Sequence, residues 1–255
     1  MEVHHHPTVE KKNFKEYLLE GLMIFLAVTM GFFAESLREH INDHTRAKEF
    51  AISMCTDLKE DSVSLVPYTK RVHYAATNLD TLFNLLSTNE AAQIATGKLY
   101  WYGLFGGLLL TFSPHDATLL EMKSTGTLRY FSNPYINRMV AGYDQMLQKI
   151  KFTDEQQQGI YTEVRTTRAE LFDFKYNEAA NTVLRRMYKK YDQQAIDSFI
   201  STNPPLISVN KVVFNKYIEL ARSRFLHSKA AEADTLLIHA GILMKALRKE
   251  YDLKD

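Results

Sequence analysis

An apolar segment near the start of the chain constrains the fold more than any other feature. Residues 21–34 contain no charged side chain, and Leu18 and Leu19 extend the apolar character past Glu20. A membrane-spanning helix needs about 20 mainly apolar residues, and residues 17–36 supply that length. Glu20 would lie about one turn inside the bilayer boundary, from which a carboxylate can reach outward. The segment therefore predicts a transmembrane helix over residues 17–36.

Two other structures suit a segment of this length. It could form a buried helix in a soluble protein, or the apolar part of a cleaved signal peptide. Cleavage after Ala34 would place bulky Phe32 where signal peptides carry a small residue. We therefore expect the segment to stay in the chain as a signal anchor.

The charges beside this segment bear on its orientation. Basic residues are equally numerous on its two sides: Lys11, Lys12 and Lys15 before it, and Arg38, Arg46 and Lys48 after it. The first group is more tightly clustered, and long domains cross a membrane largely regardless of their charge. We therefore expect a cytoplasmic N-terminus, with the larger C-terminal part on the opposite side of the membrane.

Small residues on the predicted span offer a surface for helix packing. Ala27 and Gly31 are four residues apart, which places both on one helix face and lets a second backbone approach closely. The pair predicts a homo-oligomer that forms through the membrane helix. Small residues are also common in membrane helices that do not associate, and this alternative stays open.

The composition of the remaining chain favours a helical core and excludes several classes of function. Hydrophobic residues make up 45% of the 255 residues, whereas 10 glycines and 6 prolines are few for a fold with many turns. A formal net charge of +1 gives no field that would attract nucleic acid. Cys55 is the single cysteine, which excludes an intrachain disulfide and a multi-cysteine zinc site.

The spacing of apolar residues predicts an all-α protein. No glycine or proline occurs between residues 35 and 66, so the membrane helix is expected to continue as a rod, with a break allowed at Pro67. Apolar residues then recur at steps of three and four, as in Val72, Ala75, Leu79, Leu82 and Leu86. We expect a short tail (1–16), a transmembrane helix (17–36) and a multi-helix bundle forming an extracytoplasmic domain (37–255).

Several helix ends are marked by capping residues, proline or glycine. Ser113, which precedes a proline, is expected to cap a helix that stops at Gly126, and Asn133 before a proline begins the next. Thr153 is expected to cap a further helix, and two prolines at 204–205 interrupt the pattern again. Residues 113–116 also contain serine, histidine and aspartate, but no nucleophile-elbow sequence surrounds the serine, so capping explains them better.

A second apolar run covers residues 99–112. Its 14 residues include three glycines, which makes it too short to cross a membrane as a helix. We expect it to lie in the core. Two alternatives remain: the run could line a pocket for a small molecule or lipid, or Trp101 and Tyr102 could contact lipid.

Two stretches carry a resemblance to a known family. The first combines three histidines at 4–6 with residues 12–20 and the end of the apolar segment at 28–32. The second is residues 116–129, in which Met122 and Thr125 depart conservatively from a pattern of Thr, two apolar residues, Leu-Lys-Ser-Ser-Gly, any residue and Leu. They resemble an uncharacterised family of single-span, membrane-anchored helical proteins from Bacteroidota-type bacteria. The resemblance implies a membrane location and a domain of unknown function, and it brings no catalytic residue. Together with the expected orientation, this predicts a bacterial inner membrane protein whose C-terminal domain lies in the periplasm.

Two groups of histidines are candidates for metal binding. His40 and His44 lie four residues apart on a predicted helix, so both imidazoles could bind one ion, with Asp43 or Glu39 nearby. Two ligands do not complete a site, and the order differs from the His-Glu-x-x-His motif of zinc proteases. The histidines at 4–6 could bind a metal or, when protonated, anionic headgroups. No cofactor is predicted.

Two polar clusters are candidates for a ligand or a partner. Lys123, Ser124, Gly126 and Arg129 lie at a predicted helix end and turn, where a helix stop with a salt bridge is the structural alternative. A basic cluster could bind phosphate or acidic partners, or form a solvated helix face; its members are Arg185, Arg186, Lys189 and Lys190.

The sequence shows no catalytic constellation, which favours a non-enzymatic function. We expect a membrane-anchored helical module that recruits an unknown protein partner or senses an envelope ligand, because a long helix leaving the membrane can transmit movement. A small-molecule or lipid-binding domain using residues 99–112 and an unrecognised hydrolase are the alternatives.

Overall fold

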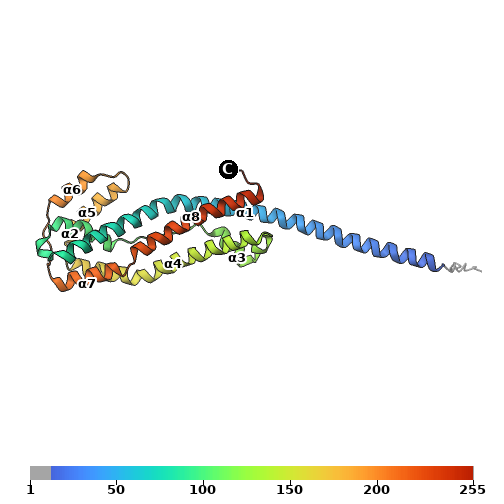
Figure 1. Ribbon diagram of the computed structural model, residues 1–255, viewed down its shortest axis with the longest axis horizontal. Coiled ribbons are helices and arrows are strands. Elements are labelled where there is room, and N and C mark those ends of the chain that lie inside the picture. The colour runs from blue at the N-terminus through green and yellow to red at the C-terminus, as the bar shows by residue number, and fades with distance from the viewer. Residues whose placement is uncertain (1–12, 255) are drawn as a thin grey trace, which may run out of the picture.

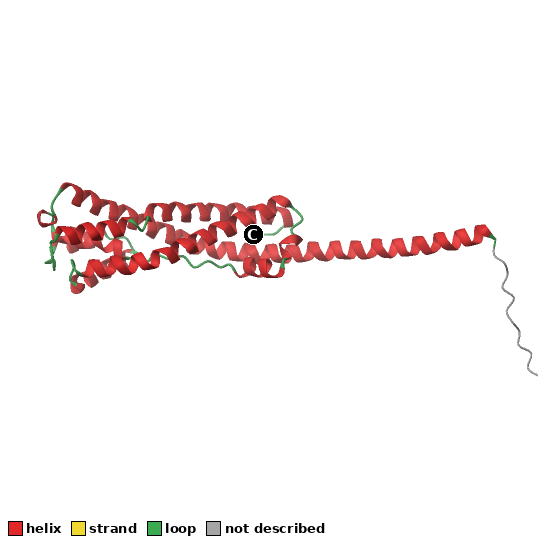
Figure 2. Ribbon diagram, turned by 90° about the horizontal axis from the view of Figure 1, so that it is seen from below, coloured by secondary structure: helices red, strands yellow, loops and turns green. Residues whose placement is uncertain are grey.

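The computed structural model describes residues 13–254, and these form an elongated helical bundle with one helix projecting far beyond it (Figures 1 and 2). The helices are α1 (Phe14–Thr88), α2 (Thr96–Leu104), α3 (Ala117–Thr125), α4 (Pro134–Ala169), α5 (Phe174–Met187), α6 (Gln193–Ser201), α7 (Lys211–Arg222) and α8 (Leu226–Tyr251). Short 3-10 turns are η1 (Ala91–Gln93), η2 (Phe105–Gly107) and η3 (Thr127–Tyr130). No strand occurs in this part of the chain, so the all-α prediction is confirmed.

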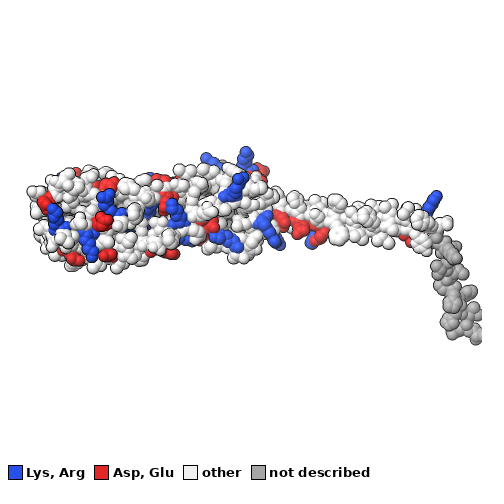
Figure 3. All heavy atoms as spheres, turned by 60° about the horizontal axis from the view of Figure 1, so that its bottom comes forward, with Lys and Arg blue, Asp and Glu red and all other residues white. Residues whose placement is uncertain are grey.

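The projecting helix is the first part of α1. α1 has 75 residues, which corresponds to about 112 Å at 1.5 Å per residue. Its first buried residue is Ala47, and none of residues 14–46 is buried. Among the described residues, α1 is the one helix long and apolar enough to cross a membrane, and none of its most apolar window is buried. The apolar segment is therefore not a core helix of the domain, and Figure 3 shows no charge along the middle of the projecting part.

The predicted break at Pro67 is wrong, because α1 continues through it to Thr88. A proline inside a helix removes one backbone hydrogen bond and costs roughly 3 kcal/mol. Leu65, Tyr68 and Val72 are buried on either side of it. Each large apolar side chain contributes about 1.5–3 kcal/mol when buried, so packing outweighs the cost of the proline.

The core lies between α1 and its two longest neighbours. α8 runs beside α1 over most of the bundle and makes the most extensive contact between any two elements, and α4 packs against the other side of α8 (Figure 1). Both helices of the first pair bury apolar residues at helical spacing, as in Leu58, Leu65, Leu82, Leu236 and Leu243. α2, α5, α6 and α7 cover the end of the bundle that lies away from the projecting helix.

Some predicted helix ends are confirmed and two are wrong. Gly126 ends α3 in the left-handed conformation, Asn133 caps α4 through its side chain, and the prolines at 204–205 lie between α6 and α7. α3 begins at Ala117 rather than beside Ser113, and carboxylates of α1 bind the amide of His115 in the preceding loop and that of Thr118 in its first turn. Thr153 begins no helix: it lies within α4, and its hydroxyl contacts Glu232.

The second apolar run lies in the core of the bundle. It forms α2 and η2 and then continues without regular structure to residue 116. Trp101 is 1% exposed, and its ring meets Phe105 edge-on with 5.8 Å between centroids. Tyr102 is partly buried and packs against the core. The run is thus too short to span a membrane as a helix, and most of it is enclosed by protein.

Buried cations hold the backbone of this run in place. Arg224 donates to the carbonyl of Gly106 at 2.7 Å, and Lys229 donates to the carbonyl of Leu110. Lys229 also forms an ion pair of 2.5 Å with Asp154. Burial lowers the pKa of Lys229, and the hydrogen bond that it donates to Asp154 opposes that effect. These side chains donate hydrogen bonds to backbone carbonyl groups that have no partner within a helix or a sheet.

Candidate functional site

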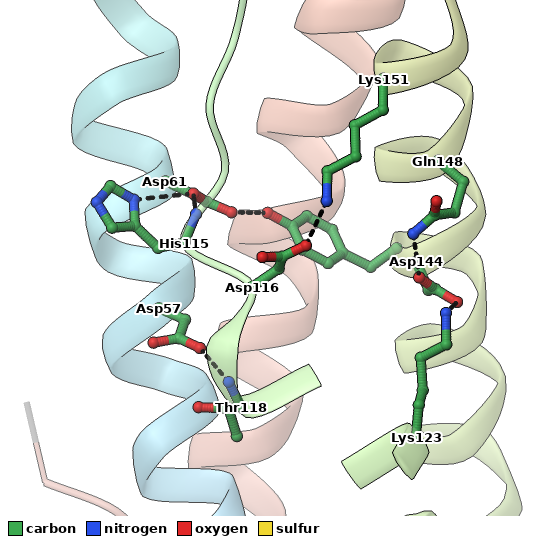
Figure 4. A network of polar contacts seen from close by, with 10 residues as sticks. Asp57, Asp61, His115, Asp116, Thr118, Lys123, Asp144, Gln148 and Lys151 are labelled. Carbon is green, nitrogen blue, oxygen red and sulfur yellow. Dashed lines mark hydrogen bonds and ion pairs between the residues drawn. The ribbon is translucent and has the colours of Figure 1, made fainter. Parts of the chain in front are cut away.

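A buried carboxylate on α1 organises the polar site of the domain. Asp61 is fully buried and accepts hydrogen bonds from the backbone N–H of His115 at 2.7 Å and from the Tyr143 hydroxyl at 2.5 Å. The Nδ1 atom of His115 lies 3.2 Å from the same carboxylate. Figure 4 shows how these groups bring α1, the loop before α3, and α4 together around Asp61. Such partners are what a buried charge needs if it is not to destabilise the fold.

The hydroxyl of Tyr143 serves as a donor in this network. Burial raises its pKa, and the hydrogen bond to Asp61 and the charge of that carboxylate raise it further. The hydroxyl therefore keeps its proton at all physiological pH values and donates a hydrogen bond to Asp61. This contact ties α4 to α1 across the core.

Further polar contacts fix the beginning of α3. Asp57, one turn before Asp61, accepts from the backbone N–H of Thr118 at 3.0 Å. Asp116 forms an ion pair of 2.6 Å with Lys151 of α4. The two carboxylates of α1 thus satisfy amides that a local cap would otherwise bind, as Figure 4 shows.

A groove of about 940 Å³ opens beside this network, between α1 and the C-terminal end of α8. Its wall includes His115 and Cys55, with Ile52 and Val63 as apolar patches. Most of the charged residues that line it are basic: Lys48, Lys59, Arg248 and Lys254, against Glu60 and Asp252. The groove therefore suits an elongated ligand with apolar and acidic groups.

Cys55 lies in the wall of the groove as a thiol. Its Sγ atom is 3.9 Å from the carbonyl oxygen of Met244. Burial raises the pKa of Cys55, and Arg248 opposes the effect. A thiolate is the nucleophilic form of cysteine, so this side chain is a poor nucleophile at neutral pH.

The imidazole of His115 is oriented but has no nucleophile to activate. Asp61 holds its Nδ1 side, and its Nε2 atom lies 3.7 Å from Glu60. Nucleophilic catalysis needs a serine, threonine or cysteine within hydrogen-bond reach of such a base. Within residues 13–254, no side chain of these types is hydrogen-bonded to the His115 ring. Through its backbone N–H and its ring, His115 anchors the loop before α3 to α1.

The predicted cluster at residues 123–129 contacts the protein itself. Lys123 forms an ion pair of 2.7 Å with Asp144, and the Ser124 hydroxyl donates to a carbonyl of its own helix. The Arg129 guanidinium lies 5.5 Å from the ring centroid of Tyr130. Gly126 has a φ of +69°, which glycine adopts without strain. The cluster closes α3 and does not line the groove.

The predicted metal ligands lie on the projecting part of α1. His40 and His44 are both exposed, and the His44 ring lies 6.0 Å from that of Tyr251. Among the described residues no group of three or more histidine, cysteine or acidic side chains is placed to hold a metal ion. The three histidines at 4–6 lie outside the described residues.

The small pair on the predicted span faces open space. Ala27 and Gly31 are exposed, and a Cβ atom built on Gly31 would meet no atom within 4 Å. A second helix could therefore approach this face without a clash. The oligomer that the pair predicts stays a prediction.

Sequence reasoning missed Asp57, Asp61 and Tyr143. A signal for Asp61 was present, because it lies three residues after Leu58 and four before Leu65 on the apolar edge of α1. An acidic residue on a buried edge requires partners, which indicates a polar network. The spacing of nearby residues does not reveal which residues these partners are, since His115 and Tyr143 are 54 and 82 residues away.

Comparisons with other proteins found no match to which this site can be related. The family resemblance of residues 116–129 stays a prediction, as does a location in the bacterial inner membrane. The chain was compared with protein-family models, curated proteins and solved structures, and none of them matched.

Proposed function

We propose that this chain is a membrane-anchored, non-enzymatic helical module that recruits a protein partner or senses a ligand in the bacterial envelope. The helix α1 carries the proposal. It begins in the apolar segment, passes the groove and ends at the far end of the bundle without interruption. A single helix that belongs to both parts can pass movement between the bilayer and the domain.

The chemistry of the site supports a non-enzymatic role. Cys55 is held as a thiol and the Asp61 carboxylate is bound by donors from two other segments. A broad activity-based probe for serine and cysteine hydrolases should therefore label no residue of the purified full chain. Stoichiometric labelling of one side chain would refute this part of the proposal.

The orientation is tested with reporters fused after Asp255. We propose a cytoplasmic N-terminus and a periplasmic domain, so alkaline phosphatase should be active there and green fluorescent protein should be dark. The matched control changes Lys15 to Glu, which weakens the basic cluster before the span. Fluorescence with no phosphatase activity in the unchanged chain would reverse the proposed topology.

The groove is the proposed surface for a partner. Ile52 and Val63 line it and are 49% and 69% exposed, so each can be replaced by a photo-crosslinking amino acid without disturbing the core. Ile238 on α8 is 60% exposed and lies outside the groove, which makes it the matched control. In native membranes, we expect one protein to be crosslinked from both groove positions and not from Ile238. Identical products from all three positions would argue against the groove.

Self-association through the span is a separate part of the proposal. Gly31→Ile places a branched side chain on the face shared with Ala27, and we expect it to reduce association in an in-membrane reporter assay. Gly21→Ile, on the same helix, is the control. Equal association of all three chains would exclude packing through Ala27 and Gly31.

A further inference from the structure

A second cavity lies between α1 and the turn that connects α5 with α6. It has a volume of about 450 Å³ and lies apart from the groove described above. Small-molecule sites typically enclose about 300–1,000 Å³. Its walls are formed by Lys70, Arg71 and Tyr74 of α1 and by Met187, Tyr188 and Tyr191. Figure 1 places α5 and α6 at the end of the domain away from the projecting helix.

The walls combine aromatic surface with positive charge. The Arg71 guanidinium lies 5.9 Å from the ring centroid of Tyr188, and its Nε donates to the carbonyl of Pro67. None of the residues that line the cavity is acidic. Within residues 13–254, neither Lys70 nor Arg71 forms an ion pair with a carboxylate. A positively charged, partly apolar cavity without its own counter-ion favours an anion from outside.

The neighbouring residues do not neutralise this charge. Asp192 follows the turn directly, but its carboxylate accepts the backbone N–H of Ala195 at 3.0 Å and caps α6. Glu178 is bound to Arg185. Lys189 and Lys190 are exposed on the same turn and add positive charge near the cavity, although they do not line it. The basic cluster predicted from sequence thus lies beside a cavity that two cations of α1 also line.

Two phenol groups of the cavity have raised pKa values and keep their protons. Burial raises the pKa of Tyr74 to about 12, and the nearby phenol of Tyr191 adds to that effect. Burial also raises the pKa of Tyr188. The Tyr191 hydroxyl donates to Gln193. The aromatic side chains therefore offer ring surface, and the negative charge must come from the ligand.

We propose that this cavity binds a small soluble organic anion with an aromatic or similarly apolar body, such as an aryl carboxylate. The carboxylate lies against Lys70 and Arg71, and the body packs on Tyr188, Tyr191 and Met187. The inference rests on the sensing part of the proposed function and names the site and the class of ligand.

The position of the cavity along α1 favours a soluble anion over a membrane lipid as the ligand. Pro67 follows Ser36, the end of the predicted span, by 31 residues, which is about 46 Å along a helix. An anionic headgroup at the bilayer surface does not extend that far. The ligand therefore reaches the cavity from solution.

The test is photolabelling of the full chain in lipid nanodiscs with 4-benzoylbenzoate, an aromatic carboxylate. Light-activated benzophenone inserts into nearby C–H bonds, and peptide mapping then reports the labelled residues without interference from probe dissolved in lipid. We expect label on Met187 or within the turn at 188–191. The amide 4-benzoylbenzamide has the same body without the charge, and it should label these residues about tenfold less, the loss expected for one charge-assisted hydrogen bond.

Two double variants separate the cavity from the general positive field. Lys70→Gln/Arg71→Gln removes the two cations of the wall and should reduce labelling about tenfold or more. Lys189→Gln/Lys190→Gln removes the same formal charge from the turn at 188–191 and should retain most of the labelling. All four side chains are exposed, so both variants should fold, and matching far-UV circular dichroism spectra check this.

Three results would overturn the proposal: no label in the cavity, equal labelling by the neutral amide, or an equal loss in both double variants. Failure here is distinct from failure of the proposed function. A reversed topology or a missing protein partner leaves this labelling intact, and an unlabelled cavity leaves the reporter and crosslinking results unchanged.

Discussion

The Tyr143 hydroxyl donates a hydrogen bond of 2.5 Å to the Asp61 carboxylate, although 82 residues separate them along the chain. Because Asp61 also binds the backbone of the loop before α3, one carboxylate connects three parts of the bundle. Breaking this connection should destabilise the domain more than the loss of a hydrogen bond between neutral groups would, since a buried charge would lose a donor.

Tyr143→Phe tests that connection. We expect the free energy of unfolding to fall by about 1.5–3 kcal/mol, the range for a hydrogen bond to a charged group. The measurement is thermal unfolding of the full chain in mild detergent, followed by far-UV circular dichroism. Tyr135→Phe, at a residue that is 55% exposed on the same helix, should change the stability by less than about 0.5 kcal/mol. Equal stability of both variants would show that the network contributes nothing.

Gly97 marks the closest approach between α2 and α6. A Cβ atom there would overlap the backbone carbonyl of Ile200, which cannot move away as a side chain could. Gly97→Ala should therefore destabilise the protein by about 1–3 kcal/mol, as overpacking of a core does. Gly159→Ala is the control, because a Cβ on Gly159 meets no atom within 4 Å and should add about 0.5–1 kcal/mol of helix stability. The two variants should thus shift the melting temperature in opposite directions, and a rise for Gly97→Ala would contradict the packing.

Pro67 should reduce the stability of α1. Pro67→Ala restores a backbone N–H inside the helix, where proline costs roughly 3 kcal/mol. Part of this gain is offset by about 0.4–1 kcal/mol, because alanine leaves the unfolded chain more freedom. We expect a net rise of about 2–2.6 kcal/mol in the free energy of unfolding, measured in thermal unfolding experiments, whereas Val66→Ala beside it, also exposed, should give little change. A loss of stability in Pro67→Ala would mean that the domain depends on the local shape that proline imposes.

Tyr217 should make the domain less stable at alkaline pH. Burial raises its pKa to about 12 in the folded protein, from an ordinary value of 10.0. A group whose pKa is higher in the folded state contributes its full stability below the unfolded pKa, and that contribution is lost as pH rises from about 10 to 12. Two pKa units correspond to about 2–3 kcal/mol.

Denaturation of the full chain at a series of pH values checks this dependence. The free energy of unfolding should fall between pH 10 and 12, and Tyr217→Phe should show a shallower fall from a lower starting value, since it also loses the hydrogen bond to Gly103. Tyr74 shifts in the same direction and leaves part of the slope in the variant. Parallel slopes for both proteins would exclude Tyr217 as a cause.

Local patterns in the sequence predicted helix ends correctly where contacts between neighbouring residues determine them. The glycine at 126 and the asparagine at 133 end and begin helices through contacts within a few residues. Prediction failed at Pro67 and Ser113, where distant residues decide. Packing against other helices carries α1 through its proline, and carboxylates from α1 replace the cap that Ser113 was expected to supply.

The same distinction explains the candidate sites. The basic cluster at 185–190 was visible in the sequence, but the cavity beside it also needs Lys70 and Arg71, more than a hundred residues earlier. The groove likewise combines residues of α1 with residues 252–254 at the other end of the chain. Spacing along the chain cannot reveal a wall built from two helices that are distant in sequence, because it describes one helix face at a time.

The unbroken length of α1 gives the domain a mechanical property. Ser36 and Thr88 are 52 residues apart on one helix, which corresponds to about 78 Å. A rigid lever of that length amplifies small rotations at its base: a tilt of about 10° displaces the far end by about 14 Å. With the apolar end of α1 in a bilayer, as proposed above, slight changes in bilayer thickness, to which spanning helices respond by tilting, would therefore move the outer tip across a distance comparable to the width of a helix.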